Sequence, residues 1–303
     1  MHKILKLSKN YFKKKQILFL FVSFFSSLYA ESSIAIFDGL PLFYWQQKEF
    51  VNFGDYLSVK IVERILDSPV AIYKKTKVPK QKLLALGSLL YFANSGDVLW
   101  GTGSNHKQTN KTDYNFTNLD VRAVRGPLTR AFIYDNFGIE CPEIYGDPAL
   151  LLPYLFPEFK KKKSPKYPFI FIPHIYERHL FSKDDGDHIV FPTEPWNEVI
   201  EKILDSEFVI SSSLHGIIVA EAYGIPARYV RLSEKEPLFK YQDYYFATGR
   251  TDFNFATSIE EAIEMMGEPS IQFDPERLYN AFPFEFWPDL NFKKPSFNRI
   301  ELL

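Results

Sequence analysis

Short apolar runs that favour β-strands alternate along this chain with segments of helical spacing, and this alternation most constrains its fold. The clearest unit is Phe208–Pro226, where the apolar run Phe208–Ile210 is interrupted by three serines and followed by helical spacing over Leu214–Tyr223. Gly224 and Pro226 stand where such a helix would stop. Strands that alternate with helices predict parallel sheets joined by crossover helices, so we expect an α/β fold.

The other candidate elements extend this alternation and indicate two α/β domains. The candidate strands are residues 34–37, 42–45, 82–86, 97–100, 120–124, 169–172, 188–191 and 227–231, and the candidate helices are residues 56–66, 127–136 and 196–204. Residues 153–168 combine four prolines with the run Lys160–Lys163, the clearest change of composition. Because 303 residues exceed the usual single-domain size, we predict two domains that face each other across a cleft. These are an N-terminal domain over residues 31–160 and a C-terminal domain with a tail over residues 161–303.

Composition and charge narrow the class of protein. Apolar residues make up 46% and aromatic residues 17% of the chain, which favours a packed globular protein over a disordered one. The net charge of −1 provides no basic surface for nucleic acid. The single cysteine, Cys141, excludes an intrachain disulfide and a multi-cysteine zinc site. Asp184, Asp185 and Asp187 lack the glutamate that completes a calcium loop, so we predict no metal site.

The first part of the chain has the layout of a secretory signal. Lysines between residues 3 and 15 precede the apolar run Ile17–Leu28, and Tyr29 and Ala30 then lead into polar residues. The apolar run is short for a membrane span, which needs about 20 residues. We therefore predict a signal peptide or an uncleaved signal anchor over residues 1–30, which would export the protein or associate it with a membrane. An upstream extension without a targeting role is the alternative.

The turn between the strand and the helix of Phe208–Pro226 is a candidate site, because ligands of open parallel sheets bind beyond the carboxyl ends of the strands. Backbone N–H groups at a helix start bind anions, and hydroxyls suit a helix cap, so Ser211, Ser212 and Ser213 are candidate substrate-binding residues. His215 could exchange protons beside a bound anion. The alternative is a histidine that is hydrogen-bonded within the packing between elements.

Other positions also carry groups that suit an anionic or polar substrate. Arg125 lies at a strand-to-helix turn and could clamp a phosphate or carboxylate, while Lys240 is a cation with aromatic neighbours. An exposed ion pair and a surface lysine are the alternatives. The amides of Gly101-Thr102-Gly103 could cradle a substrate or form only a tight turn. Asp147 could be a base, although an aspartate before proline commonly forms a turn.

Several short motifs, taken in order, resemble those of the polysaccharide pyruvyl transferases. The motifs are Asn52–Ser58, Leu86–Ser88, Val98–Gly103, Val121–Pro127, Gly146–Ala149, Ile172–His174, Ser211–Gly216 and Lys240–Tyr244. No single motif is specific, but their joint order over residues 42–250 is. The resemblance implies that the essential histidine, arginine and lysine of this family are His215, Arg125 and Lys240. Asp55 and His174 lie in two of these motifs, and we add them to the predicted substrate-binding residues.

The same resemblance implies a fold and a reaction. The fold would be two Rossmann-like domains arranged as in the GT-B glycosyltransferases. The reaction would move a pyruvyl group from phosphoenolpyruvate onto two hydroxyls of one sugar as a cyclic ketal, in exopolysaccharide or other cell-surface glycan biosynthesis. Phosphoenolpyruvate would be a co-substrate, and no further cofactor is implied. Many members carry an arginine two residues before the histidine, where this chain has Ser213.

Two other functions fit the same elements. The first is a GT-B glycosyltransferase that uses a nucleotide-sugar donor, because fold class alone does not choose the donor. The second is a diverged, noncatalytic carbohydrate-binding protein. The N-terminal segment and the donor also point to different compartments, since phosphoenolpyruvate is a cytosolic metabolite and residues 1–30 resemble an export signal. Membrane tethering or donor import into a lumen would reconcile the two.

Overall fold

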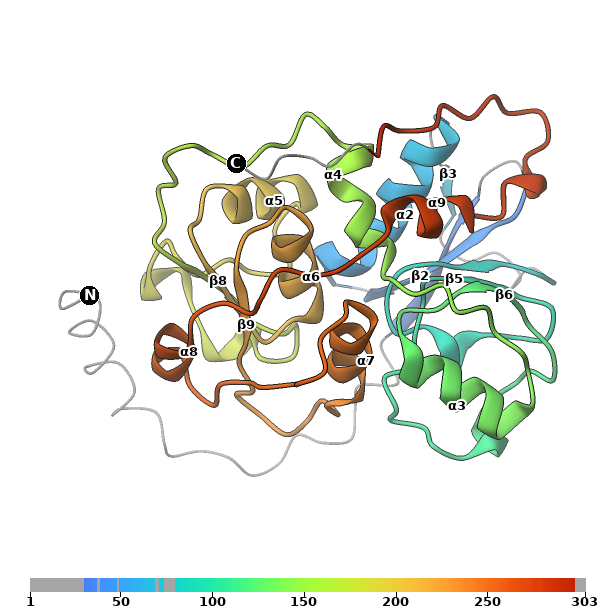
Figure 1. Cartoon of the computed structure of the whole chain (residues 1–303), viewed down its shortest axis with the longest axis horizontal. Coiled ribbons are helices and arrows are strands. Elements are labelled where there is room, and N and C mark those ends of the chain that lie inside the picture. The colour runs from blue at the N-terminus through green and yellow to red at the C-terminus, as the bar shows by residue number, and fades with distance from the viewer. Residues whose placement is uncertain (1–29, 37–38, 48, 69–70, 74–79, 298–303) are drawn as a thin grey trace.

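Two sheets lie side by side in this protein, with helices around them and between them (Figure 1). The structure is a computed structural model that describes residues 30–36, 39–47, 49–68, 71–73 and 80–297. Residues 1–29 of the predicted signal segment lie outside the described residues. Within the described part of the chain, none of the helices is long and apolar enough to cross a membrane.

The first sheet has six strands in the order β3-β1-β2-β4-β5-β6. These strands are β1 (Ala30–Ile36), β2 (Leu42–Gln47), β3 (Ala71–Tyr73), β4 (Leu83–Leu84), β5 (Val98–Trp100) and β6 (Asp120–Ala123). Strands β2, β4, β5 and β6 pair in parallel, as the alternation of strands and helices in the sequence predicts. However, β1 pairs antiparallel with both β2 and β3, which the prediction of parallel sheets missed. The link from β1 to β2 is too short for the crossover that a parallel pair needs, so these two strands form a hairpin.

The second sheet has three parallel strands, β7 (Ile170–Ile172), β8 (Val209–Ser211) and β9 (Ala227–Tyr229), in that order. The strand predicted at residues 188–191 forms only a single bridge, between Ile189 and Phe171. Pro192 follows at once, and proline has no N–H group with which to continue a ladder. The prediction of a full strand there was wrong.

The helix bounds agree closely with those predicted from the sequence. The first is α2 (Phe53–Leu66), which begins three residues before its predicted start because Asn52 caps it by accepting a hydrogen bond from the Gly54 amide at 3.2 Å. Three further helices lie within one residue of their predicted bounds, and they are α3 (Pro127–Phe137), α5 (Trp196–Leu204) and α6 (Leu214–Ala222). Gly138 ends α3 in the left-handed conformation, with φ 67°.

One apolar core runs through both sheets. Alternate residues of each strand point to opposite faces, so Leu42 and Val98 of the first sheet share this core with Ile170 and Val209 of the second. The opposite faces bury separate clusters, one around Phe43 and Leu99 and one around Phe171 and Ile210. The short helix α4 (Leu152–Leu155) also packs in the shared core, so the proline-rich segment predicted as a linker begins inside the protein.

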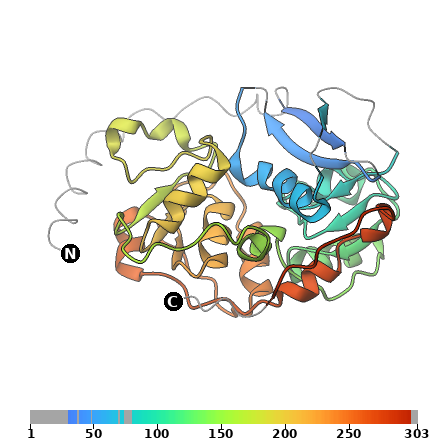
Figure 2. The same cartoon turned by 90° about the horizontal axis from the view of Figure 1, so that it is seen from above.

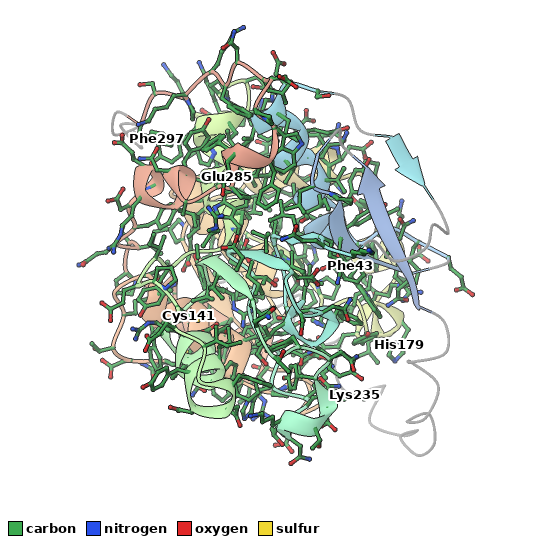
Figure 3. The ribbon with its side chains drawn as sticks, turned by 90° about the vertical axis from the view of Figure 1, so that its right-hand side faces the viewer. Phe43, Cys141, His179, Lys235, Glu285 and Phe297 are labelled. Atoms are coloured by element: carbon green, nitrogen blue, oxygen red, sulfur yellow. The ribbon has the colours of Figure 1, made fainter. Side chains whose placement is uncertain are left out.

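The last described segment returns from the second sheet to the first (Figure 2). After α7 (Phe239–Ala247) and α8 (Ile259–Met265), the chain forms α9 (Pro275–Asn280) beside the first sheet. There the indole Nε1 of Trp100 donates to the Leu278 carbonyl at 2.9 Å, and its ring meets Phe282 edge to face. Arg122 of β6 pairs with Glu285, and Figure 3 labels Glu285 in a view of this side of the molecule. The predicted C-terminal tail therefore joins the two sheets.

Candidate active site

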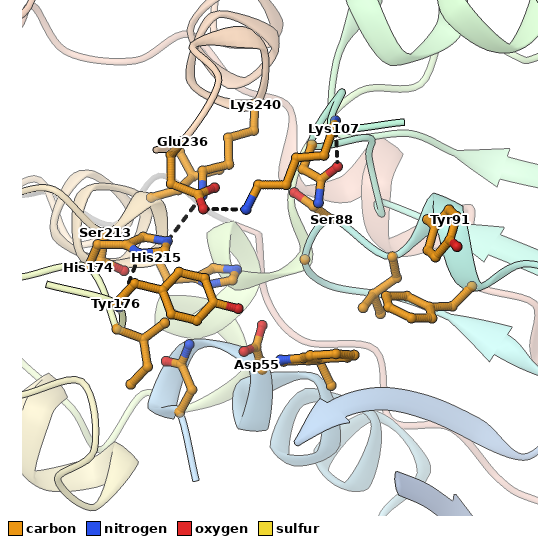
Figure 4. A pocket seen from close by; sticks show the side chains of 18 of the residues that line it. Asp55, Ser88, Tyr91, Lys107, His174, Tyr176, Ser213, His215, Glu236 and Lys240 are labelled. Atoms are coloured by element: carbon orange, nitrogen blue, oxygen red, sulfur yellow. Dashed lines mark hydrogen bonds and ion pairs between the residues drawn. The ribbon is translucent and has the colours of Figure 1, made fainter. Parts of the chain in front are cut away.

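A cavity of about 620 Å³ opens between the two sheets and is lined by residues of both (Figure 4). Its walls include the start of α2 and the loops that follow β4, β5, β7 and β8. These loops lie at the carboxyl ends of parallel strands, where the sequence predicted a ligand site. The lining residues used below are Trp45, Asp55, Ser88, Tyr91, Phe92, Lys107, His174, Tyr176, Ser213, His215, Glu236 and Lys240.

His215 lines this cavity from the first turn of α6, and a buried carboxylate lies behind it. Its Nε2 is 3.8 Å from Oδ2 of Asp147, and neither atom has a hydrogen-bond partner among the described residues. The other oxygen of Asp147, Oδ1, accepts from the Ala149 amide at 3.0 Å and caps a 3-10 helix over Pro148–Leu151. The turn-forming interpretation of Asp147 is therefore confirmed. Asp147 does not line the cavity, and its Oδ2 lies behind the ring of His215, beyond hydrogen-bond distance of Nε2.

The imidazole of His215 lies directly against the backbone of α2. A Cβ atom added to Gly54 would be only 2.2 Å from Nδ1 of His215, closer than any real contact. The glycine in the Asn52–Ser58 motif is thus required for the close approach of α6 to α2. Because the amide of Phe53 also donates to the Pro192 carbonyl at 2.8 Å, the start of α2 is anchored to the second half of the molecule.

Asp55 projects into the cavity from the first turn of α2, below His215 in Figure 4. Burial raises the pKa of this carboxyl to about 6, although the neighbouring His215 and Lys240 act in the opposite direction. A carboxyl with a pKa near neutrality can both accept and donate a proton at physiological pH. The predicted substrate-binding residue Asp55 is therefore also suited to proton transfer.

Lys240 lies in α7 and takes part in a chain of polar contacts along one wall. Its Nζ donates to Oε2 of Glu236 at 2.8 Å and to Nε2 of His174 at 3.2 Å. Burial, together with Lys240, lowers the pKa of His174 to about 3, so its imidazole is neutral and can accept this bond. Burial also lowers the pKa of Lys240, and Glu236 opposes that shift. The predicted residues Lys240 and His174 thus meet in the cavity.

Of the three serines before α6, only Ser213 lines the cavity. Ser213 is the N-cap residue, but its hydroxyl makes no capping bond; instead, Oγ of Ser211 accepts from the Ser213 amide at 3.0 Å. The Ser212 hydroxyl donates to Glu177 at 2.5 Å and accepts from the His174 amide at 2.7 Å. Ser211 and Ser212 therefore shape the turn and position His174 without lining the cavity, and their role as substrate contacts stays a prediction.

Arg125 is wholly buried behind the cavity wall. Its guanidinium donates to Asp243 through Nε at 3.1 Å, to the Ser88 hydroxyl at 2.8 Å and to the Ser104 carbonyl at 2.5 Å. Since each nitrogen of the guanidinium already has a partner, the structure does not place Arg125 as a direct clamp for phosphate. It holds Ser88, which does line the cavity.

Gly101-Thr102-Gly103 forms a turn outside the cavity lining, and its role as a substrate cradle stays a prediction. The amide of Gly101 donates to the Ala123 carbonyl at 2.9 Å, and the amide of Gly103 donates to the Gly87 carbonyl at 3.0 Å. The Thr102 hydroxyl also donates to the Gly87 carbonyl, at 2.9 Å. These groups are used within the protein. Gly101, with φ +82°, additionally leaves room for Pro148, whose ring would be 2.4 Å from an added Cβ.

Several residues that line the cavity were not predicted from the sequence. Lys107 follows β5 on the polar loop after Gly103, and its Nζ pairs with Glu236 at 2.5 Å. Glu236 lies in the bend before α7, four residues from Lys240, and this short separation along the chain was its signal in the sequence. Trp45, Tyr91 and Phe92 form an aromatic wall of the cavity, and Figure 4 shows Tyr91 on the side away from His215. Phe92 contacts both other rings, with centroids 5.1 Å and 5.3 Å away.

The geometry supports chemistry on an anionic substrate beside a polar one. Lys107 and Lys240 can bind negative charge, Asp55 and His215 can move protons, and the aromatic wall offers apolar faces to a second substrate. Among the described residues, no group of three or more histidines, cysteines, aspartates or glutamates is arranged to hold a metal ion.

Comparison with known proteins agrees on a family. A family model described as polysaccharide pyruvyl transferase matches residues 52–234. The chain is 28% identical over 219 residues to the succinoglycan biosynthesis protein ExoV of Rhizobium meliloti (strain 1021), which covers 69% of this chain and 65% of that protein. It is also 28% identical over 193 residues to uncharacterized protein L143 of Acanthamoeba polyphaga mimivirus, covering 60% of this chain and 64% of that protein. The matched region spans a little under two thirds of the length of each relative.

Proposed function

Because the chain belongs to the polysaccharide pyruvyl transferase family, we propose that it transfers a pyruvyl group from phosphoenolpyruvate to two hydroxyls of one sugar, forming a cyclic ketal. We further propose that the sugar belongs to a polysaccharide of the cell surface or exterior. The likeness to a succinoglycan biosynthesis protein supports this. The family match includes the start of α2 and the start of α6, which carry Asp55 and His215 to the cavity.

The observation that carries this proposal is the meeting of His215, Asp55 and Lys240 in one cavity. These three side chains come from α6, α2 and α7, on elements far apart in the sequence. Phosphoenolpyruvate brings a phosphate and a carboxylate, which need cationic partners, and a methylene carbon that must be protonated. Lysine ammonium groups and two proton-transfer groups are what this reaction requires.

The proposed reaction proceeds by addition and elimination at the carbon of phosphoenolpyruvate that bears the phosphate. The methylene carbon of phosphoenolpyruvate gains a proton and becomes a methyl group, and a sugar hydroxyl adds at the adjacent carbon. The bond from this carbon to the phosphate oxygen then breaks, and a second hydroxyl of the same sugar closes the ketal. The two hydroxyls lose two protons in total; one is retained in the methyl group, and the other leaves with inorganic phosphate. The donor itself carries the activated group.

We assign His215 as the acid or base at the methylene carbon of the donor, with the Asp147 carboxyl behind its ring, 3.8 Å from Nε2. Asp55, on the side of the cavity nearer the first sheet, is placed to accept a proton from a sugar hydroxyl. Lys240 would bind the donor's negative charge. Arg125 is a positioning residue in this proposal, acting through Ser88. We also propose that the two sheets form the Rossmann-like halves of a GT-B-like arrangement, with the sugar against the aromatic wall.

His215→Ala provides the test of the proposed function. The purified full chain is given phosphoenolpyruvate and candidate glycans, and phosphate release and product mass are measured. Loss of a general acid or base reduces turnover by about 100-fold to 10,000-fold, so we expect a fall of that size. His179→Ala, at an exposed histidine outside the cavity, is the matched control and should retain activity. Unchanged turnover in His215→Ala would remove this residue from the mechanism.

The same assay separates the alternative functions. Protection of the wild-type protein from thermal unfolding only by a nucleotide sugar would favour a glycosyltransferase, since a ligand stabilises the folded state that binds it. Glycan binding without phosphate release from phosphoenolpyruvate would favour a noncatalytic carbohydrate-binding protein. Phosphate release with a product heavier by one pyruvyl ketal would support the proposed reaction.

A further inference from the structure

We propose that Lys107 is a second donor-binding cation, and that the carboxylate of Glu236 occupies the place that an anionic group of the donor takes when it binds. The inference rests on the proposed function for the identity of the donor. It concerns residues that the sequence motifs did not include, and it assigns them a role in that same cavity.

The geometry of three side chains carries this inference. Nζ of Lys107 lies 2.5 Å from Oε1 of Glu236, and Nζ of Lys240 lies 2.8 Å from Oε2 of the same carboxylate. Two ammonium groups therefore bind the two oxygens of one carboxylate at the cavity wall, as Figure 4 shows. A carboxylate or phosphate of a ligand presents oxygen acceptors with the same charge and similar spacing.

The exposure of the three side chains identifies the open side of this arrangement. The side chains of Glu236 and Lys240 are each only 10% exposed, whereas that of Lys107 is 35% exposed. Lys107 also lies 5.5 Å from the centre of the Tyr176 ring, another residue of the cavity wall. Its ammonium thus faces the cavity, where an entering anion would meet it first.

Charge balance explains why the second cation is needed. Among the described residues that line the cavity, Lys107 and Lys240 are the lysine or arginine side chains, and the start of α6 contributes Ser213 and His215. Arg125 is shielded, since its guanidinium would be 2.5 Å from a Cβ added to Gly103. A donor with a phosphate and a carboxylate carries more negative charge than Lys240 alone balances. Lys107 supplies the missing positive charge from the first sheet.

Glu236 keeps the two lysines together in the absence of a ligand. Although burial opposes it, the neighbouring lysines lower the pKa of Glu236 to about 2, so this carboxylate is charged at any physiological pH. With Glu236 in place, each ammonium has a strong acceptor. A donor anion that replaces it preserves the charge-assisted hydrogen bonds of both lysines, and the exchange leaves neither ammonium unpaired.

The test compares Lys107→Met with Lys107→Arg in the full chain. Loss of one charge-assisted hydrogen bond costs about 1.5–3 kcal/mol, so the Kd and KM for phosphoenolpyruvate should rise about 10-fold to 100-fold in Lys107→Met. The acceptor KM should stay unchanged, and kcat should change little. Lys107→Arg should restore most of the donor affinity. Lys111→Met is the matched control, because Lys111 is exposed on the same loop outside the cavity.

Binding of inorganic phosphate, measured by calorimetry, provides a second readout that needs no turnover. Glu236→Gln removes the competing carboxylate, so phosphate should bind more tightly to this variant than to the wild type. Equal donor affinity in the wild type and Lys107→Met would overturn the role of Lys107 but leave the proposed function intact. Weaker phosphate binding in Glu236→Gln would overturn the replacement of its carboxylate. A wild-type protein that binds neither phosphoenolpyruvate nor phosphate would overturn both the inference and the proposed function.

Discussion

Asp55 shows how the fold changes the chemistry of a single residue. An exposed aspartate is ionised at neutral pH, but burial raises the pKa of Asp55 to about 6, with Asp147 acting in the same direction and His215 and Lys240 opposing the shift. Ionised Asp55 therefore opposes folding, and the protein retains it at the cavity wall. Perturbed carboxyls of this kind concentrate at functional sites. The proposed role of Asp55 in proton transfer would explain why the protein retains a carboxyl at this cost in stability.

Asp55→Asn should stabilise the protein at pH 7.5 and reduce its activity. Because the folded-state pKa lies above the ordinary value of 3.8, the folded protein binds this proton more tightly than the unfolded chain does. The opposition to folding is therefore complete above pH 6 and fades as the pH falls toward 3.8. The shift corresponds to at most about 3 kcal/mol.

Chemical denaturation at pH 7.5 and pH 4 measures this difference. The gain in the free energy of unfolding should be present at the higher pH and absent at the lower one. Asp135→Asn, on the exposed surface of α3, is the matched control and should change little at either pH. A gain that is the same at both pH values would contradict the shifted pKa of Asp55.

At the scale of elements, the start of α2 organises the site. Asn52 caps the helix, Gly54 admits the ring of His215, and Asp55 faces the cavity, all within the first turn. The same turn is fixed to the second half by the bond from the Phe53 amide to the Pro192 carbonyl. One helix start thus aligns proton-transfer groups from two sheets.

Gly54→Ala should disable the site without unfolding α2. Alanine favours a helix over glycine by about 1 kcal/mol, so the helix itself gains stability. The added methyl group would lie 2.2 Å from Nδ1 of His215, however, and the ring must move away. A displacement of about 1 Å at a reacting group costs about 100-fold in rate, so kcat should fall by that order.

Gly138→Ala is the matched control for Gly54→Ala. Gly138 ends α3 with φ 67°, and nothing lies within 4 Å of an added Cβ. We expect this variant to lose about 1 kcal/mol of stability through backbone strain and to keep its kcat. Circular dichroism and turnover, measured on both variants, separate the two effects. Full activity in Gly54→Ala would show that the contact with His215 is not required.

At the scale of the whole molecule, buried polar contacts fasten the two halves together along with the shared core. Asp243 of α7 binds Arg125 through Oδ2 and accepts from the Thr129 amide of α3 through Oδ1 at 2.9 Å. Both Arg125 and Asp243 have fully buried side chains. The backbone of α7 also packs against Gly126, where an added Cβ would be 1.9 Å from the Asp243 carbonyl oxygen. These contacts fix the positions of the two cavity walls relative to each other.

Asp243→Ala should destabilise the whole molecule strongly. It leaves the guanidinium of Arg125 buried without its counter-charge, a change that typically costs about 3–5 kcal/mol. Lys294→Ala is the matched control, because the pair of Lys294 with Glu276 has both side chains about half exposed and is expected to contribute less than about 1 kcal/mol. Thermal or denaturant unfolding of the two variants gives the comparison. Equal losses would show that the buried pair is not a main link between the halves.

Much of the fold and part of the candidate site were predictable from the sequence. The spacing of apolar residues located α5, α6 and most of the parallel strands, because helical spacing and short apolar runs each reflect burial of a local stretch of chain. The turn chemistry of Gly101-Thr102-Gly103 was visible, but the acceptors of its amides were not. His215, Lys240, Asp55, His174 and Ser213 line the cavity, whereas Arg125 is paired behind it. A sequence pattern states which groups are present, and long-range packing selects which of them remain open to a ligand.

The sequence by itself determined the order of strands and helices, the family, and the place of His215 at a helix start after a strand. The elements depend on residues that are close together in the chain, and the family is identified by the order of short motifs along it. Only the tertiary structure decided that Asp147 lies behind His215, that Arg125 is held by Asp243, and that Lys107 meets Glu236. The last pair is separated by 129 positions in the sequence. Such pairings depend on how two sheets and the loops at their carboxyl ends approach each other, and no local pattern encodes that approach.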